Sequence, residues 1–237
     1  MIPLFKVFMA PTAKEKVGEV LDSGYIGQGP KVDEFEKQLG EYFNNSKVVT
    51  LNSGTSALHL ALHLLKKPFK KMVNFEGLMT KEEYWPGIEP GDEVLATPLT
   101  CTASNWPILA NGLKIKWVDI DPTTLDDLER KLSSKTKAII GVHWGGYPLD
   151  LDRIFQIRNK FNSKHGWSPS LIEDGAHAIG TKYKGHYLGN HGNFVMQSLQ
   201  AIKHITSIDG GVLYCPHHEL YERAKLVRWY GIDRNPE

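Results

Sequence analysis

The chain has 237 residues, with 28 Lys and Arg against 27 Asp and Glu, so its formal net charge is +1. This balance gives no electrostatic field suited to nucleic acid or an anionic membrane, and we expect a small-molecule partner. With 41% hydrophobic and 23% charged residues, the composition is that of a globular protein and excludes a disordered chain. Its length suits one large α/β domain that needs no disulfide or metal in its core.

The two cysteines, Cys101 and Cys215, lie far apart and form no C-x-x-C pair. The sequence therefore predicts no disulfide framework, and a reducing cytoplasmic location is expected. His59 and His63 share a helix face without a third ligand nearby, so no metal site is expected. No signal peptide is visible, and the longest uncharged stretch, residues 94–113, contains two prolines, which argues against a membrane helix.

Hydrophobic periodicity predicts the first elements of the chain. Apolar residues recur three and four apart over residues 12–22 and 31–43, which indicates two amphipathic helices joined by a loop. A short strand at 48–51 follows, then small residues and an apolar helix at 57–65. Residues 66–90 contain several lysines and prolines, and we interpret them as a surface insertion.

After this insertion, strands and helices alternate. In chain order we expect a strand at 94–96, a helix at 103–110, a strand at 115–120, a helix at 124–132, a strand at 138–142, a helix at 151–161, a strand at 170–173, a hairpin at 181–188, and strands at 193–198 and 211–214. Such alternation predicts an α/β fold, a three-layer α/β/α sandwich with a mostly parallel sheet.

Ligands of open parallel sheets bind at the carboxyl ends of the strands. After the first strand, Gly54, Thr55 and Ser56 begin a helix, and their N–H groups and hydroxyls suit a phosphate. The same residue types also form ordinary helix caps. Asp174 follows the strand at 170–173 and precedes small residues that let a flat ligand approach the backbone.

Ser198 and Lys203 follow a later strand. Each of these residues alone has an ordinary structural explanation, a cap or a solvated side chain. Together, a phosphate cradle, an acid at a strand end and a lysine beyond the next strand are what pyridoxal phosphate (PLP) requires. In such a site, Lys203 would attach the cofactor through its aldehyde, and Asp174 would keep a proton on the ring nitrogen.

Six segments of the chain resemble the DegT/DnrJ/EryC1/StrS family of sugar-nucleotide aminotransferases, which are fold-type-I PLP enzymes. The segments are SGYIGQGPKVDEFE, LNSGTSALHLAL, PGDEVLATPLTCTASNWPILANG, GVHWGGYPLDLDRI, LIEDGAHAIGTKYKGHYLGNHG and SLQAIKHITSIDGGVL. The resemblance implies that Lys203 binds the cofactor covalently and that Asp174 is the partner of the ring nitrogen. It also implies that Thr55, Ser56 and Ser198 bind the phosphate.

The resemblance also implies an activity and an assembly. The enzyme would transfer an amino group from an amino acid, glutamate, to a nucleotide-linked keto sugar for polysaccharide biosynthesis. Family members are homodimers, and the loop at 24–30 would face the neighbouring subunit. They continue into a smaller C-terminal domain, so we expect residues 1–237 to be the large domain alone and to turn over poorly.

Two alternatives remain open. One is a PLP-dependent sugar dehydratase of the same family, in which a histidine stands where the aminotransferases have lysine; here Lys203 is followed by His204. The other is a truncated, non-catalytic PLP-binding remnant.

The chain departs from the family pattern at three places. Cys101 stands where an aromatic residue commonly stacks on the cofactor ring, so either Cys101 packs there or Trp106 serves instead. His177 stands where Gln is common, and a neutral imidazole can bond the 3-oxygen of the cofactor. The insertion at 66–90 is longer than the usual connection.

Overall fold

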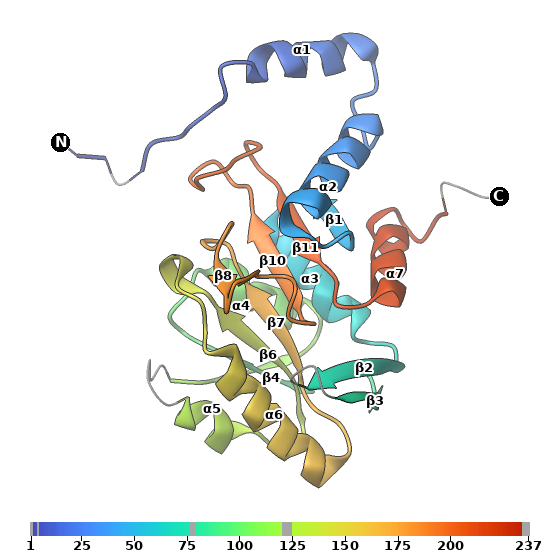
Figure 1. Cartoon of the computed structure of the whole chain (residues 1–237), viewed down its shortest axis with the longest axis vertical. Coiled ribbons are helices and arrows are strands. Elements are labelled where there is room, and N and C mark those ends of the chain that lie inside the picture. The colour runs from blue at the N-terminus through green and yellow to red at the C-terminus, as the bar shows by residue number, and fades with distance from the viewer. Residues whose placement is uncertain (1, 4, 76–78, 120–124, 234–237) are drawn as a thin grey trace.

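The structure, a computed structural model, describes residues 2–3, 5–75, 79–119 and 125–233 (Figure 1). Within these residues, seven strands form one sheet in the spatial order β1-β11-β10-β7-β6-β4-β5. Its strands are β1 (Val48–Leu51), β4 (Glu93–Ala96), β5 (Lys114–Trp117), β6 (Thr136–Val142), β7 (Ser170–Asp174), β10 (Phe194–Ser198) and β11 (Gly211–Tyr214). The helices are α1 (Ala13–Ser23), α2 (Pro30–Phe43), α3 (Gly54–Leu64), α4 (Thr102–Ala110), α5 (Asp126–Lys131), α6 (Leu151–His165) and α7 (His218–Arg228), with a short 3-10 turn η1 (Trp144–Gly146).

The direction of the strands confirms a mostly parallel sheet. The pairs from β10 through β7, β6 and β4 to β5 are parallel, whereas β11 runs antiparallel to both β10 and β1. The carboxyl ends of β4, β6, β7 and β10 therefore meet at one edge of the sheet, which is where such folds bind ligands.

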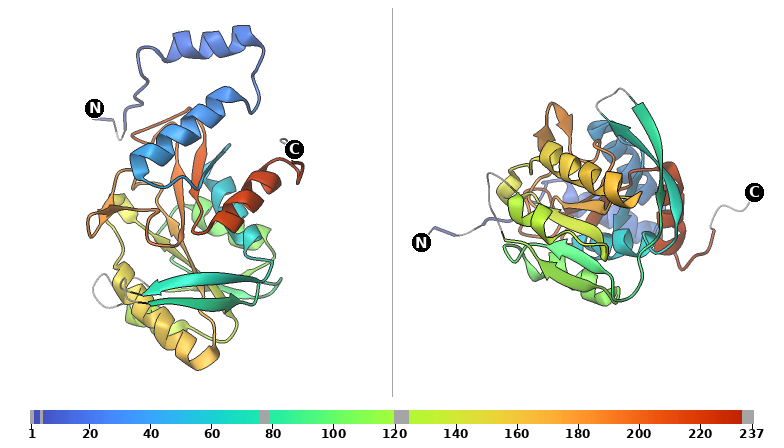
Figure 2. Two further views of the ribbon diagram at one scale, coloured as in Figure 1. Left: turned by 45° about the vertical axis from the view of Figure 1, so that its right-hand side comes forward. Right: turned by 90° about the horizontal axis from the view of Figure 1, so that it is seen from below.

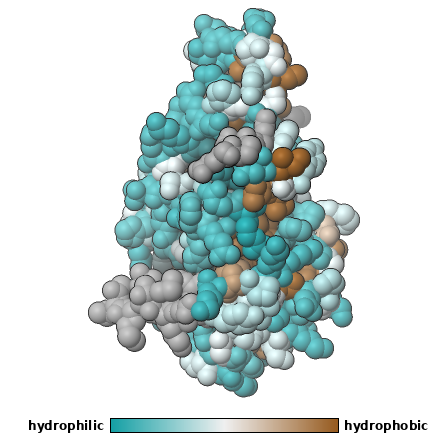
Figure 3. All heavy atoms as spheres, turned by 90° about the vertical axis from the view of Figure 1, so that its right-hand side faces the viewer, coloured by the Kyte–Doolittle hydropathy of each residue, from teal (hydrophilic) through white to brown (hydrophobic). Residues whose placement is uncertain are grey.

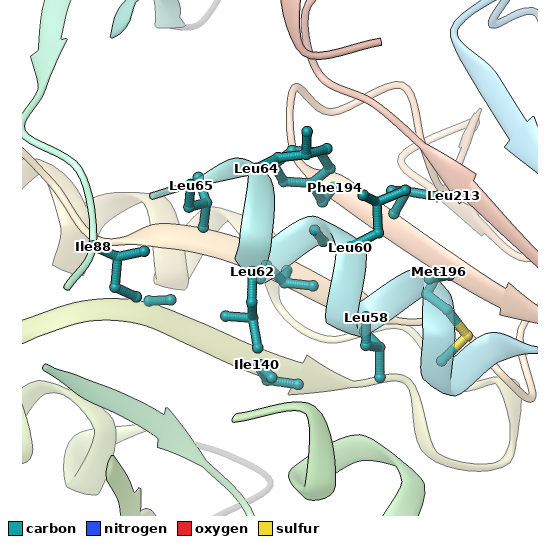
Figure 4. Packing of buried hydrophobic residues seen from close by; sticks show 14 of the residues in the cluster. Leu58, Leu60, Leu62, Leu64, Leu65, Ile88, Ile140, Phe194, Met196 and Leu213 are labelled. Carbon is teal, nitrogen blue, oxygen red and sulfur yellow. The ribbon is translucent and has the colours of Figure 1, made fainter. Parts of the chain in front are cut away.

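Helices cover both faces of the sheet, so the expected three-layer α/β/α sandwich is confirmed (Figures 1 and 2). Buried residues of α3, α4 and α7 pack on one face, and those of α2, α5 and α6 on the other. Figure 4 shows the leucines of α3 against Ile140 of β6, Met196 of β10 and Leu213 of β11. Each fully buried leucine contributes roughly 1.5–3 kcal/mol.

Helix α3 is apolar nearly all round because it lies between the sheet and α4. Its exposed side chains are those of His59 and His63, so these two histidines lie at the helix surface. The helix begins where Ser53, in extended conformation, accepts a hydrogen bond from the Ser56 N–H at 3.1 Å. This cap fixes the start of the first turn, as the small residues of the sequence predicted.

The insertion at 66–90 is a β-hairpin, where the sequence suggested only a surface excursion. Strands β2 (Phe69–Phe75) and β3 (Met79–Trp85) pair antiparallel. Its base is held by Trp85, which is fully buried and donates an Nε1 hydrogen bond to the Leu65 carbonyl at 2.8 Å. The ring also packs edge-on against Trp167. The lysines and prolines of this segment obscured that anchoring in the sequence.

The remaining boundaries lie close to those predicted, with one helix missed. The hairpin expected at 181–188 is formed by β8 (Lys182–Tyr183) and β9 (His186–Tyr187). The expected ends at residues 120 and 124 lie outside the described residues. Helix α7 was not predicted, because only Leu220 and Ala224 of its residues are buried and its polar positions masked the period.

Helix α1 buries no residue, and Figures 1 and 2 show it standing away from the sheet at one end of the molecule. Figure 3 shows hydrophobic side chains on one side of that end and again further down the same side of the molecule, on a face that is hydrophilic over most of its remaining area. Among the helices of the described residues, none is both long enough and apolar enough to cross a membrane.

Gly211 of β11 lets the turn between β1 and α3 lie directly on the sheet. A Cβ at this position would lie 2.2 Å from the Ser53 carbonyl oxygen and 2.6 Å from the Gly54 nitrogen, both backbone atoms that cannot rotate away. Gly211 also pairs with Ser198 of β10. The absent side chain thus brings the α3 N-terminus and the end of β10 together.

We predict that Gly211→Ala destabilises the fold by about 1–3 kcal/mol, because the added methyl group forces the backbone of the β1–α3 turn to move. Gly18→Ala in α1 is the matched control, since its Cβ would meet no heavy atom within 4 Å and its φ is not positive. The control should be neutral or stabilise by about 0.5–1 kcal/mol. Denaturant unfolding of both variants measures this, and equal stabilities would contradict the packing.

Candidate active site

Side chains of β7 and β10 present polar groups to the face covered by α3 and α4. Met196 of β10 is the register partner of Asp174 on β7, so the two side chains share one face of the sheet. Ser198 lies two residues further along β10 and points to the same face. The predicted acid and one predicted phosphate ligand therefore lie on neighbouring strands at the same edge.

Asp174 is buried, with 4% of its surface exposed. Its Oδ2 accepts a hydrogen bond from Ser104 Oγ of α4 at 2.5 Å, and its Oδ1 accepts one from the Ala176 N–H at 3.0 Å. No ion pair joins Asp174 to another of the described residues. A buried carboxylate with only neutral donors is incompletely compensated, and its environment suits a cationic partner.

The N-terminus of α3 lies next to Ser198. A Cβ at Gly54 would lie 3.2 Å from Ser198 Cβ and 2.8 Å from Met196 Sδ, so only glycine allows this approach. Thr55 and Ser56 occupy the first turn of α3, where N–H groups have no carbonyl partner within the helix. The structure thus brings Gly54, Thr55, Ser56 and Ser198 together at a helix N-terminus suited to a phosphate.

Lys203 lies in the loop that connects β10 to β11. The Leu199 N–H donates to the Gly210 carbonyl at 2.9 Å and the Ser207 N–H to the Leu199 carbonyl at 3.1 Å, so the base of the loop is closed. Within the described part of the chain, the Lys203 ammonium has no hydrogen-bond or ion-pair partner. Its side chain is half-buried, whereas the neighbouring His204 is exposed.

His177 lies at the same edge, in the loop after β7. Its ring packs edge-on against Trp144, with centroids 5.5 Å apart, and its Nδ1 accepts a long hydrogen bond of 3.4 Å from the Gly145 N–H. Partial desolvation lowers the pKa of His177 below its ordinary value, the charge of Lys203 lowers it further, and Asp174 raises it. The imidazole is therefore neutral at pH 7, and Lys203, Asp174 and His177 share one electrostatic environment.

Of the two candidates for stacking on a cofactor ring, the structure disfavours Trp106. It lies two residues after Ser104, which is about 200° around a helix, and Ser104 faces Asp174. Trp106 therefore points away from Asp174, and 59% of it is exposed. Cys101 is exposed and stands immediately before α4, as its N-cap residue in extended conformation.

Ser104 and Thr100 are site residues that the sequence reasoning missed. Ser104 is 2% exposed, and its Oγ lies 2.6 Å from Thr100 Oγ1. Both belong to the segment TPLTCTAS, which was noted for its resemblance, but no local spacing links them to an acid 70 residues away.

A second buried polar group lies on the opposite face of β7. Glu173, fully buried, accepts hydrogen bonds from Asn193 Nδ2 at 2.7 Å and pairs with His143 Nε2 at 2.9 Å. His143 Nδ1 accepts from the Leu149 N–H at 3.1 Å, so the ring proton is on Nε2. In the sequence, an acidic residue directly after two apolar strand residues could have indicated this buried group, but the sequence analysis did not use it.

The comparisons with known proteins identify the family. The profile of the DegT/DnrJ/EryC1/StrS aminotransferase family matches residues 9–73 and 75–237. The chain belongs to this family. Among solved structures of similar proteins is AtS13 from Actinomadura melliaura, 52% identical with a TM-score of 0.88, covering 100% of this chain and 59% of that one. The sugar aminotransferase CalS13 from Micromonospora echinospora is 44% identical with a TM-score of 0.87, covering 100% and 60%.

Curated proteins similar to this chain include UDP-4-amino-4-deoxy-L-arabinose--oxoglutarate aminotransferase from Shewanella sediminis. It is 33% identical over 220 residues, which are 91% of this chain and 50% of that protein. The chain spans about half the length of the curated relatives it matches. The family predicted from six sequence segments is confirmed.

Two further DegT/DnrJ/EryC1/StrS-like structures are relevant to the chemistry. The sugar aminotransferase Spr1654 from Streptococcus pneumoniae has been solved in a PLP form and a PMP form, each 30% identical to this chain with a TM-score of 0.79. Each match covers 95% of this chain, and it covers 57% of the Spr1654 chain in the PLP form and 56% in the PMP form. A GDP-4-keto-6-deoxymannose-3-dehydratase is 25% identical with a TM-score of 0.79, covering 98% of this chain and 55% of its own.

We predict that Lys203→Met raises the pKa of His177, because it removes a positive charge that acts on a partly exposed ring. Lys182→Met is the control, since Lys182 lies over the Tyr187 ring in the β8–β9 hairpin and does not act on His177. Imidazole NMR titration of both variants measures the shift. An unchanged His177 midpoint in Lys203→Met would show that the two residues do not share a site.

Proposed function

We propose that the chain forms the PLP-binding large domain of an aminotransferase that transfers an amino group from glutamate to a nucleotide-linked keto sugar. The observation that carries this proposal is the buried Asp174 carboxylate, which has neutral donors but no cation among the described residues. It lies on the same sheet face as Ser198 and at the same edge as Lys203.

The residues present fit the cofactor. A protonated pyridine nitrogen is the cation that Asp174 lacks, and the N-terminus of α3, packed closely beside Ser198, suits a phosphate. Thr55, Ser56 and Ser198 supply hydroxyl donors there. When bound, PLP supplies an electron sink that stabilises negative charge on the substrate carbon.

The other residues of the site have roles that follow from their positions. Lys203 would bind the cofactor aldehyde through Nζ and, once displaced by the amino substrate, would move a proton to and from the substrate carbon. His177, neutral and beside Lys203, would bond the 3-oxygen of the ring. Cys101 would contact the ring from the start of α4, with less area than an aromatic residue.

The substrate class rests on the relatives. The arabinose aminotransferase acts, by its name, on a UDP-linked sugar and oxoglutarate, the keto acid of glutamate. The Bacillus subtilis protein SpsC is named for spore coat polysaccharide biosynthesis. We propose the same class of nucleotide-linked sugar here, and a cytoplasmic location because Cys101 and Cys215 are both free thiols.

The dehydratase alternative is supported by two similar structures, both of a GDP-4-keto-6-deoxymannose-3-dehydratase. In the family that this chain resembles, a dehydratase carries histidine at the lysine position. Here Lys203 is half-buried at the site, whereas His204 is exposed. This difference favours the aminotransferase over the dehydratase.

We predict that borohydride reduction of the PLP-loaded protein places the pyridoxyl label on Lys203, because the charges of both Lys203 and Asp174 act on His177. Peptide mapping locates the label, and added glutamate should convert the bound PLP to its amine form by absorbance. Lys203→Met should abolish labelling, while Lys182→Met should retain it. A label on Lys182, Lys184 or Lys225 would show that the site is misplaced, and conversion without labelling of Lys203 would also contradict the proposal.

We also propose that two copies of the chain associate through α1 and the loop at 24–30. Val17 and Leu21 lie four residues apart on α1 and are 54% and 62% exposed. Tyr25 and Ile26 in the following loop are 59% and 71% exposed. Four exposed apolar side chains so close together in sequence, on an arm that stands away from the sheet, fit a second copy of the same chain.

Leu21→Glu should weaken the dimer by about 100-fold or more, because in a symmetric dimer the apolar contact is lost from both copies. Lys14→Glu, also exposed on α1, changes charge without removing apolar surface and should leave the dimer intact. Sedimentation at micromolar concentration, with circular dichroism to check folding, measures both. Wild-type protein that sediments only as a monomer would contradict this assembly.

A further inference from the structure

The hydroxyl of Ser104 makes the shortest contact of the Asp174 carboxylate. Ser104 Oγ lies 2.5 Å from Oδ2, whereas the Ala176 N–H donates to Oδ1 at 3.0 Å. Ser104 and Asp174 are 2% and 4% exposed, so water does not compete for this bond. A short hydrogen bond to a charged group in a buried site is about twice as strong as one between neutral groups.

The direction of the protons in this group follows from their number. Ser104 has one hydroxyl proton, and an ionised carboxylate can only accept, so that proton goes to Asp174. Thr100 Oγ1, 2.6 Å from Ser104 Oγ, must then donate to Ser104. The chain Thr100 to Ser104 to Asp174 thus points entirely toward the carboxylate, and each bond polarises the next.

This arrangement is not explained by helix capping. Ser104 is the third residue of α4, and its own N–H already donates to the Cys101 carbonyl at 3.0 Å. Its side chain crosses to the end of β7, 70 residues away in sequence. The hydroxyl therefore acts on Asp174 rather than on the helix that carries it.

We infer that Ser104 is a positioning residue that keeps Asp174 ionised, so that the proton shared with the cofactor resides on the ring nitrogen and not on the carboxyl group. This inference rests on the proposed function. Two bases compete for that proton, and donation from Ser104 makes the carboxylate the weaker one. Without it, a buried carboxyl group takes the proton, and the ring is left neutral and a poorer electron sink.

The test uses PLP labelled with nitrogen-15 in the ring, whose chemical shift distinguishes a protonated from a neutral nitrogen. In Ser104→Ala the share of the proton that the ring nitrogen holds should fall, with the ratio between ring nitrogen and carboxyl group changing by about 10- to 100-fold, the range expected for a lost hydrogen bond to a charged group. Thr100→Val removes only the outer donor and should cause a smaller fall. The titratable groups beside Asp174, His177 and Lys203, are the same in all variants.

Ser168→Ala is the matched control, because Ser168 is 4% exposed and precedes β7 at the end opposite Asp174. It should keep the wild-type share of protonated ring nitrogen, and Ser104→Thr, which retains a hydroxyl, should restore most of that share. Circular dichroism verifies folding, and if Ser104→Ala does not fold, Thr100→Val carries the test.

The outcomes separate this inference from the proposed function. A ring nitrogen that is protonated in the wild type and protonated to the same extent in Ser104→Ala and Thr100→Val would overturn the role of Ser104 alone. A wild-type protein that binds no PLP, or holds it with a neutral ring nitrogen, would overturn the proposed function and this inference with it. A fall in both variants that is absent in Ser168→Ala supports the inference.

Discussion

The last two residues of β7 carry buried carboxyl groups, and because side chains alternate along a strand, these two groups lie on opposite faces of the sheet. Glu173 faces the α6 side and Asp174 the α3 and α4 side. Burial of a charge requires partners, so each face must supply its own donors. Asn193 and His143 supply the donors for Glu173, and Ser104 and the Ala176 N–H supply those for Asp174.

Close approach of three backbones makes the site possible on the Asp174 face. Gly175 allows the chain after β7 to pass within hydrogen-bond distance of β10, since a Cβ there would lie 2.8 Å from the Met196 carbonyl oxygen. Gly54 and Gly211 do the same for the α3 N-terminus. Because these three residues have no side chain, the backbone of the α3 N-terminus can lie directly against the ends of β7, β10 and β11.

Local patterns explain why most of the fold could be predicted from the sequence. Alternating strands and helices, and the small residues that begin α3, depend on near neighbours. Asp174 and Lys203 were predicted as site residues because each follows an expected strand, whereas the contact of Ser104 with Asp174 became visible only when α4 was packed against β7. The base of the β2–β3 hairpin likewise depends on Trp85 reaching Leu65 and Trp167, which no sequence period records.

The two faces of β7 differ in net charge, and this difference decides on which face a charged ligand is expected. Glu173 Oε1 accepts a hydrogen bond from Asn193 Nδ2, and Asn193 Oδ1 lies 3.4 Å from Nη1 of the Arg158 guanidinium. The other carboxylate oxygen of Glu173, Oε2, pairs with a neutral His143. A negative and a positive group thus balance on that face. On the other face, neutral donors stabilise Asp174 without cancelling its charge. Within the described residues, the negative charge of Asp174 is therefore not balanced, and it lies at the same edge of the sheet as the α3 N-terminus and Lys203. A ligand with a cationic ring for Asp174 and an anionic phosphate for the helix N-terminus is complementary to this edge.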